Sequence, residues 1–123
     1  MIGYVTVGTN HKERASKFYD TLFQALGAQR VFSIERIIGW GIGTSQPWFC
    51  IAEPFDGKDA TIGNGDMTAL KVQSKDDVNS LYAKAMELGA KDEGPPGDRD
   101  DGFYGGYFRD LDGNKLVFFT IVT

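Results

Sequence analysis

The chain has 123 residues, of which 41% are hydrophobic and 13% aromatic, with a formal net charge of -4 at pH 7 and a single cysteine, Cys50. This length favours one domain, and the acidic balance argues against nucleic-acid binding, which needs clustered Lys and Arg. No stretch approaches the ~20 apolar residues of a membrane span, no secretory signal is expected, and one cysteine gives no disulfide framework, so we expect a cytoplasmic protein.

The first half of the chain predicts a strand, a helix and three further strands. Residues 2–7 are rich in β-branched side chains, as strands are. Asn10 is expected to cap the helix with Glu13 completing a capping box, and Gly27 is expected to end it. Apolar residues then recur at helical spacing on one face: Ala15, Phe18, Tyr19, Leu22 and Leu26. The strands expected after this helix span residues 30–35, 37–43 and 48–52.

The second half repeats this order. Residues 67–72 predict a strand, Ser74 a helix cap with Asp77 three residues later, and Gly89 the helix end. The apolar stripe of this helix is Val78, Leu81, Ala85 and Leu88. A poor, short strand is expected near Lys91 and Asp92, followed by clear strands over 103–109 and 116–122 that flank an Asp112-Gly113 turn.

Matching motifs relate the two halves. Phe18-Tyr19 corresponds to Leu81-Tyr82, and Leu26-Gly27-Ala28 corresponds to Leu88-Gly89-Ala90. The sequence therefore predicts an α+β fold of two βαβββ repeats in one domain, residues 1–53 and 67–123, joined by a Gly- and Pro-containing linker over 54–66. A ferredoxin-like βαββαβ order is the competing fold, but it would leave only one strand after the second helix.

In this order and spacing, the motifs resemble the vicinal oxygen chelate superfamily, which includes glyoxalase I, extradiol dioxygenases and bleomycin resistance proteins. The motifs that carry the resemblance are Phe18-Tyr19-Asp20, Leu26-Gly27, Leu88-Gly89-Ala90 and the run from Arg109 to Lys115. The linker also resembles that of a small bacterial glyoxalase-like subgroup. The resemblance implies a curved mixed sheet in each repeat, a cup formed by the two repeats, and a homodimer.

The resemblance also implies a divalent metal held by His and Glu side chains. Counted from Phe18-Tyr19, the two His positions fall on Tyr4 and Thr68, one carboxylate position falls at or near Val117, and the other lies within residues 48–52, which hold no carboxylate. No shift of one residue supplies a His. The sequence therefore predicts no metal site and no cofactor, while a divalent metal on unusual oxygen ligands such as the Tyr4 hydroxyl stays an alternative.

No catalytic residue is predicted. His11 is the only histidine, and its place at a helix start is typical of a solvated residue. Cys50 lies in an apolar strand, where a thiol is usually inert packing, so a Cys50–His11 nucleophilic pair is not favoured. Asp110, Asp112 and Asn114 imitate the start of a calcium loop, but the sixth position is not the required Gly.

Aromatic and hydroxyl side chains instead predict a small-molecule site. The expected wall residues are Tyr4, Trp40, Trp48, Thr68, Tyr104 and Tyr107. Alternation within the strand 103–109 means that Tyr104 and Tyr107 face the same side only if a bulge forms near Gly105-Gly106.

Two functions follow as hypotheses. The first is a metal-independent protein, like bleomycin resistance proteins, that binds a small aromatic or amphipathic molecule; the sequence pI near 4.9 fits a cationic ligand. The alternative is a metal-dependent lyase or isomerase of the lactoylglutathione lyase type, or a dioxygenase-related enzyme, with a reorganised site. A domain whose cup serves only packing or partner contact is a third hypothesis.

Overall fold

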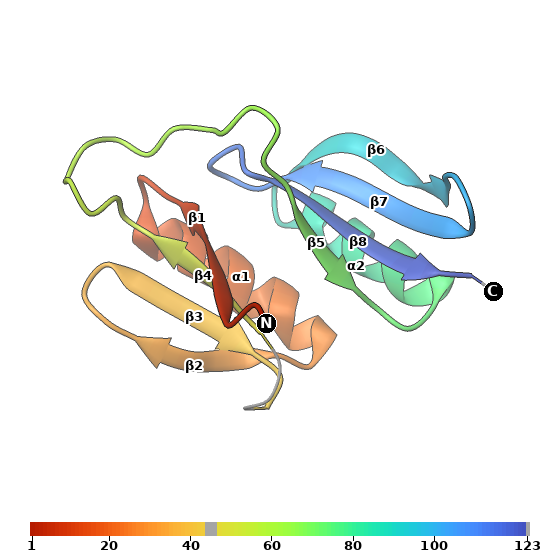
Figure 1. Cartoon of the computed structure of the whole chain (residues 1–123), viewed down its shortest axis with the longest axis horizontal. Helices are drawn as coiled ribbons and strands as arrows, with labels where there is room; N and C mark the ends of the chain where they lie inside the picture. The colour runs from red at the N-terminus through yellow and green to blue at the C-terminus, as the bar shows by residue number, and fades with distance from the viewer. Residues whose placement is uncertain (44–46, 123) are drawn as a thin grey trace. The chain divides into compact units, whose positions relative to one another are not determined.

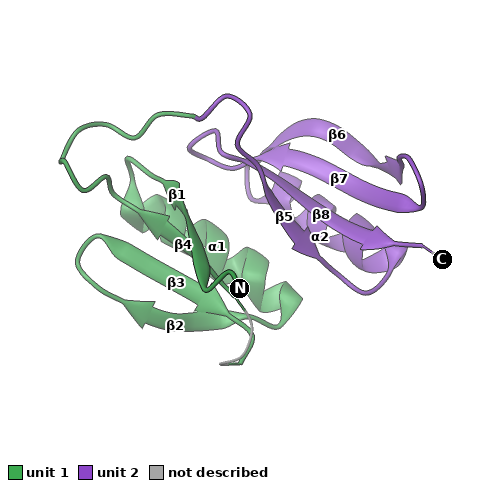
Figure 2. Ribbon diagram, viewed as in Figure 1, with its two compact units in different colours: residues 1–62 green, residues 63–123 purple. Residues whose placement is uncertain are grey.

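The computed structural model describes residues 1–43 and 47–122, and in it the chain forms the βαβββ order twice (Figure 1). The chain divides into two compact units, unit 1 (Met1–Ile62) and unit 2 (Gly63–Thr123) (Figure 2). The predicted linker, residues 54–66, contains the boundary between them. None of the described helices is long and apolar enough to cross a membrane.

Unit 1 contains one helix and one four-stranded sheet. Its elements are β1 (Tyr4–Gly8), α1 (Lys12–Leu26), β2 (Gln29–Ser33), β3 (Ile37–Gly41) and β4 (Trp48–Ala52). The strand order is β1-β4-β3-β2, with β1 parallel to β4 and the other pairs antiparallel. Because parallel neighbours need a long crossover, the helix and two strands lie between β1 and β4 in the chain.

Helix α1 covers one face of this sheet, and aromatic rings fill the space between them (Figure 1). The Tyr19 ring centroid lies 4.8 Å from that of Phe49 and 5.6 Å from that of Trp40. Phe23 completes the cluster, with its centroid 5.3 Å from Phe49. Strand alternation therefore makes the Trp40 and Phe49 side the helix-covered face, and residues of the other parity lie on the helix-free face.

Unit 2 repeats this architecture. Its elements are β5 (Thr68–Lys71), α2 (Lys75–Glu87), β6 (Lys91–Asp98), β7 (Phe103–Arg109) and β8 (Lys115–Ile121). The strand order is β5-β8-β7-β6, with β5 parallel to β8. A Cβ added to Gly106 would lie 3.1 Å from the Tyr82 ring of α2, so Gly106, and with it Tyr104 and Phe108, faces the helix. Tyr107 and Arg109 consequently lie on the helix-free face of this sheet.

The pairing of β7 with β8 is continuous, from Phe103 opposite Ile121 to Arg109 opposite Lys115. No bulge forms at Gly105-Gly106. Tyr104 and Tyr107 therefore face opposite sides of the sheet, as strand alternation predicts.

The two helix starts differ from each other. Ser74 caps α2 as predicted, since its Oγ accepts a hydrogen bond from the Asp77 N–H at 3.1 Å. The Asn10 prediction is wrong: α1 begins at Lys12 with His11 at the N-cap position and no side-chain cap bond. The Asn10 side chain bonds Ala60 instead, accepting from its N–H at 2.6 Å and donating to its carbonyl at 3.1 Å.

Strand β6 is longer than the short candidate near Lys91 and Asp92. It spans eight residues despite Pro95 and Pro96, and its pairing with β7 shifts register on both sides of Gly94. An edge strand tolerates prolines because one of its sides has no ladder partner to satisfy. Gly94, at φ 150, takes a backbone conformation that favours glycine.

Candidate functional site

The helix-free face of unit 1 carries a pair of aromatic rings over two glycines. Phe32 lies over Gly39 and Trp48 lies over Gly41, where an added Cβ would be 2.5 Å from the indole Cδ1. The two ring centroids are 5.6 Å apart. Tyr4, the register partner of Trp48 on β1, is 57% exposed on the same face. Glycine at 39 and 41 thus lets a flat aromatic surface form directly on the strands.

Trp48 also carries an unpaired donor. Within residues 1–43 and 47–122, its Nε1 is the one buried side-chain nitrogen or oxygen without a hydrogen-bond partner. Leaving such a donor unsatisfied costs ~1–3 kcal/mol. Because this N–H is buried, an acceptor on a bound molecule would pair it only if the atoms that cover it move aside.

Cys50 lies on the same face but offers no nucleophile. The side chain is fully buried, and burial raises the pKa of its thiol to about 11. The thiol is therefore protonated at neutral pH, whereas attack requires the thiolate. His11 is exposed at the start of α1, beside a hollow of about 460 Å³ that also involves Glu13 and Glu53.

The helix-free face of unit 2 carries charged side chains around Tyr107. Tyr107 lies beneath two cations, with Arg99 Cζ 5.3 Å and Lys115 Nζ 5.5 Å from its ring centroid. Arg109 Nε donates to Glu93 Oε1 at 2.6 Å. This hydrogen bond is the main reason that the pKa of Glu93 lies below its usual value.

The structure divides the predicted wall residues equally between the two kinds of face. Those on helix-free faces are Tyr4, Trp48 and Tyr107, and those on helix-covered faces are Trp40, Thr68 and Tyr104. Residues of the second group contact their own unit's core or helix. The structure thus places these three away from the helix-free faces, and their role in ligand binding stays a prediction.

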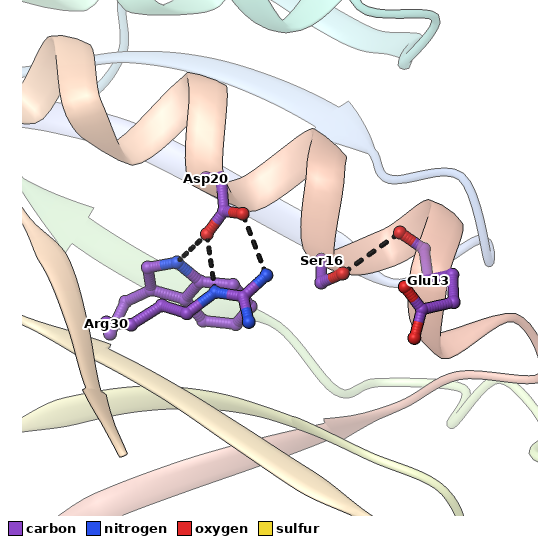
Figure 3. A network of polar contacts seen from close by, with 5 residues as sticks. Glu13, Ser16, Asp20 and Arg30 are labelled. Carbon is purple, nitrogen blue, oxygen red and sulfur yellow. Dashed lines mark hydrogen bonds and ion pairs between the residues drawn. The ribbon is translucent and has the colours of Figure 1, made fainter. Parts of the chain in front are cut away.

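Trp40 is part of an unpredicted polar network with Asp20 of α1 and Arg30 of β2, and Figure 3 shows the Asp20–Arg30 pair of this network. It is 1% exposed, and its Nε1 donates to Asp20 Oδ1 at 3.0 Å. Arg30 donates hydrogen bonds to the same carboxylate from Nε and Nη2, both at 2.8 Å. The side-chain hydrogen bond from Arg30 is the largest cause of the lowered pKa of Asp20. A hollow of about 380 Å³ lies beside this cluster, but both carboxylate oxygens already accept hydrogen bonds. These hydrogen bonds connect α1 to β2 and β3.

Tyr104 and Thr68 are fixed from the helix side of unit 2. The Tyr104 hydroxyl donates to Asn79 Oδ1 of α2 at 2.6 Å, and Lys75 Nζ lies 5.1 Å from the ring centroid. Thr68 is the register partner of Leu116, which is fully buried. Neither side chain extends to the helix-free face.

Equivalent hydrogen bonds allow the two units to be aligned residue by residue. The Thr9 N–H donates to the Ala52 carbonyl at 3.0 Å in unit 1, and the Val72 N–H donates to the Phe119 carbonyl at 2.8 Å in unit 2. Both bonds join the residue after the first strand to the last strand of its unit. Thr9 therefore corresponds to Val72, and Ala52 corresponds to Phe119.

This alignment corrects one position of the expected metal site. Counting back along the strands, Met67 rather than Thr68 corresponds to Tyr4, and Val117 corresponds to Cys50. These side chains are a thioether, a phenol, an alkyl group and a protonated thiol, so they do not fit a His and Glu site. Over the described residues, no three or more His, Cys, Asp or Glu side chains cluster in a way that could hold a metal ion. We derive no chemical step through a metal.

Comparison with known proteins gives a consistent set of relatives. A family model described as Glyoxalase/Bleomycin resistance protein/Dioxygenase superfamily matches residues 1–118. The crystal structure of a glyoxalase/bleomycin resistance protein from Albidiferax ferrireducens is 32% identical, with 99% of each chain covered and a TM-score of 0.90. A hypothetical protein from S. aureus is 25% identical, with 98% of this chain and 92% of that chain covered and a TM-score of 0.75.

A lactoylglutathione lyase from Agrobacterium tumefaciens has a TM-score of 0.73 over 98% of this chain and 92% of that chain. Its identity is 15%, so this likeness concerns the fold alone. No curated protein matches the sequence.

Proposed function

Because the chain belongs to the Glyoxalase/Bleomycin resistance protein/Dioxygenase superfamily, we propose that it uses the family fold to bind a small aromatic or amphipathic molecule without the metal of the family's enzymes. The observation that carries this proposal is the buried Trp48 indole N–H in unit 1, which has no hydrogen-bond partner among the residues that the structure describes. A ligand with an acceptor atom would pair this donor and cover the Phe32–Trp48 aromatic surface.

The side chains at the family's metal positions support this proposal over a lyase or isomerase. A metal-dependent isomerase needs lone-pair donors that converge on one ion. Val117 has no such donor, and the Cys50 thiol keeps its proton. The homodimer and the cytoplasmic location stay predictions.

The proposal is tested by NMR of ¹⁵N-labelled protein, in which each of the two indole N–H groups gives its own signal. A panel of neutral aromatic alcohols, beginning with 4-nitrobenzyl alcohol, is titrated in the presence of EDTA. We expect a saturable shift of the Trp48 signal and a small or absent shift of the Trp40 signal, because Trp40 is buried and already bonded to Asp20.

Trp48→Phe and Trp40→Phe assign the two signals and act as matched variants. Trp48→Phe should weaken binding about tenfold, as expected for loss of a hydrogen bond and part of the stacking surface, whereas Trp40→Phe should leave affinity unchanged. The proposal fails if no member of the panel shifts Trp48. It also fails if purified protein holds stoichiometric zinc, nickel or iron that is required for turnover of a thiohemiacetal.

A further inference from the structure

The helix-free face of unit 2 contains a preformed arrangement of two cations around one aromatic ring. Arg99 and Lys115 approach Tyr107 from different elements, the turn after β6 and the start of β8, at 5.3 and 5.5 Å from the ring centroid. Tyr107 itself lies in the middle of β7, opposite the buried Val117. Two positive groups are thus held over one strand position.

Glycines in β6 make room for the Arg99 side chain. An added Cβ at Gly97 would lie 2.8 Å from Arg99 Nη1, and one at Gly94 would lie 3.3 Å from Arg99 Nη2 and from Tyr107 Cδ1. The guanidinium is anchored by donation from Nη2 to the Pro95 carbonyl at 2.8 Å. A larger residue at 94 or 97 would crowd the guanidinium, so the two glycines leave the space that Arg99 occupies.

The carboxylates nearby do not neutralise these two cations. Glu93 is engaged by Arg109 at 2.6 Å. The other acidic side chains of β6 are committed to the helix side, where Asp92 accepts from the Tyr82 hydroxyl and Asp98 pairs with a lysine of α2. Among the described residues, neither Arg99 nor Lys115 has a carboxylate within ion-pair distance. The charge of Lys115 does help to lower the pKa of Glu93, after the hydrogen bond and charge of Arg109, but Lys115 forms no direct ion pair with that carboxylate.

We propose that unit 2 binds a small aromatic carboxylate, with the carboxylate held by Arg99 and Lys115. Guanidinium offers two parallel donors that match a carboxylate, and an ammonium adds a second charge-assisted bond. Apolar surface for the rest of the ligand comes from Phe103 and Phe119, whose rings stack at 4.8 Å on the same face. This site goes beyond the proposed function, stands on unit 2 alone, and requires an anion rather than the cationic ligand suggested by the pI.

Three probes that differ only in charge test this site: 4-nitrobenzoate, 4-nitrobenzyl alcohol and 4-nitrobenzylammonium. Binding is measured by calorimetry and by NMR shifts of the Arg99 Nε–H and the Tyr107 amide. We expect 4-nitrobenzoate to bind at this site about tenfold more tightly than the alcohol, and the ammonium compound not to shift these signals.

Arg99→Gln and Lys115→Gln should each weaken 4-nitrobenzoate binding about tenfold. Lys75→Gln is the matched control, because Lys75 also lies over a tyrosine ring in unit 2 but on the helix-covered side. Equal affinity for the anion and the alcohol, or an equal loss in all three variants, would overturn the inference. So would inorganic phosphate binding as tightly as 4-nitrobenzoate, since that would show an adventitious anion site only.

The Trp48 signal in unit 1 separates this result from the proposed function. A shift of Trp48 with the alcohol, without preference for the anion at Arg99, supports the proposed function and overturns the carboxylate site. A shift of the Arg99 signal with 4-nitrobenzoate, while no probe shifts the Trp48 signal, supports the carboxylate site and overturns the proposed function.

Discussion

At the scale of single residues, Asp20 connects three elements. It lies in α1, accepts the indole N–H of Trp40 from β3, and accepts two bonds from Arg30 of β2 (Figure 3). The Arg30–Asp20 side chains are 40% and 42% exposed, so solvent screens the ion pair. The indole N–H is buried, so its hydrogen bond contributes more to stability than the ion pair does.

We therefore predict that Asp20→Ala lowers the free energy of unfolding by about 1–2 kcal/mol, because the Trp40 N–H loses its acceptor. Arg30→Gln should cost less than about 1 kcal/mol. The loss for Asp20→Asn should lie between the losses for Asp20→Ala and Arg30→Gln, since an amide oxygen still accepts the indole hydrogen bond. Urea unfolding at pH 7 measures all three variants, and an Arg30→Gln loss as large as that of Asp20→Ala would show that the ion pair dominates.

The difference in unfolding free energy between wild type and Asp20→Ala should depend on pH, and its sign follows from the lowered pKa of Asp20. The folded-state pKa of Asp20 is lowered from 3.8, so its stabilising contribution is present above that pH and is lost as the pH falls through the lower, folded value. The difference between wild type and Asp20→Ala should therefore narrow below about pH 3.8.

The orientation of single aromatics shows where sequence prediction succeeds and where it stops. Tyr104 and Tyr107 belong to one strand, so alternation alone places them on opposite faces. Trp40 and Trp48 belong to different strands, and their relative facing depends on the pairing of Trp40 with Phe49. A shift of that register by one residue would exchange the two roles, and no local pattern specifies it.

At the scale of elements, the same kind of side chain performs different tasks at the two helix starts. Ser74 caps α2, whereas the Asn10 side chain accepts a hydrogen bond from Ala60 and so connects the segment around Ala60 to the residues just before α1. Local sequence favours Asn10 as a cap equally well, because the competing partner is fifty residues away and invisible to a local pattern.

We predict that Asn10→Ala accelerates hydrogen exchange of the Ala60 amide at least about tenfold, because that amide loses its 2.6 Å acceptor, and leaves the first turn of α1 little changed. Ser74→Ala serves as the contrast, since it should accelerate exchange at Asp77 and destabilise unit 2 by about 1 kcal/mol. Faster exchange throughout α1 in Asn10→Ala would mean that Asn10 does support the helix.

Strand β6 was difficult to predict for a physical reason. Its run of Gly and Pro lacks the alternation and β-branched residues by which strands are recognised. Tertiary pairing with β7 forms it nonetheless, and Gly94 and Gly97 both pair with β7 and leave room for the Arg99 side chain. Tyr107 was among the predicted wall residues, whereas the role of Arg99, which follows β6, was missed for this reason.

At the scale of the whole molecule, the fold was predictable because the βαβββ order occurs twice in the sequence, so each half supports the prediction for the other. Helix periodicity and glycine stops occur in the same order in both halves, and the observed strand order is the same in both units. The candidate site was only partly predictable, since it depends on which face of each sheet the helix covers.

Alkaline pH should affect the molecule through the buried Cys50 of unit 1 and the half-buried Tyr82 of unit 2. The pKa of Cys50 is raised from 9.0 to about 11 by burial, and that of Tyr82 from 10.0 to about 12 by burial and by its bond to Asp92. For a group that keeps its proton longer in the folded state, stability is complete below the unfolded pKa and is lost as pH rises through the folded value. Unit 1 should therefore weaken first, between pH 9 and about 11.

We predict a loss on the order of 2 kcal/mol from Cys50 over this range, measured by urea unfolding at stepped pH values. Cys50→Ala should remove the slope between pH 9 and 10, below the unfolded pKa of Tyr82, and Tyr82→Phe should leave that part of the slope in place. If Cys50→Ala keeps the full slope, the alkaline loss has another origin.

The strand order has a consequence for the making of the protein. In each unit the first strand pairs with the last, Tyr4 with Trp48 and Thr68 with Leu116. On the ribosome, β1 must therefore wait for β4 to be translated and to emerge, which takes a few seconds at about 5–20 residues per second. During that delay Val5 and Val7 have no sheet partner, so the interval in which a nascent chain is open to chaperones or to aggregation is set by the topology itself.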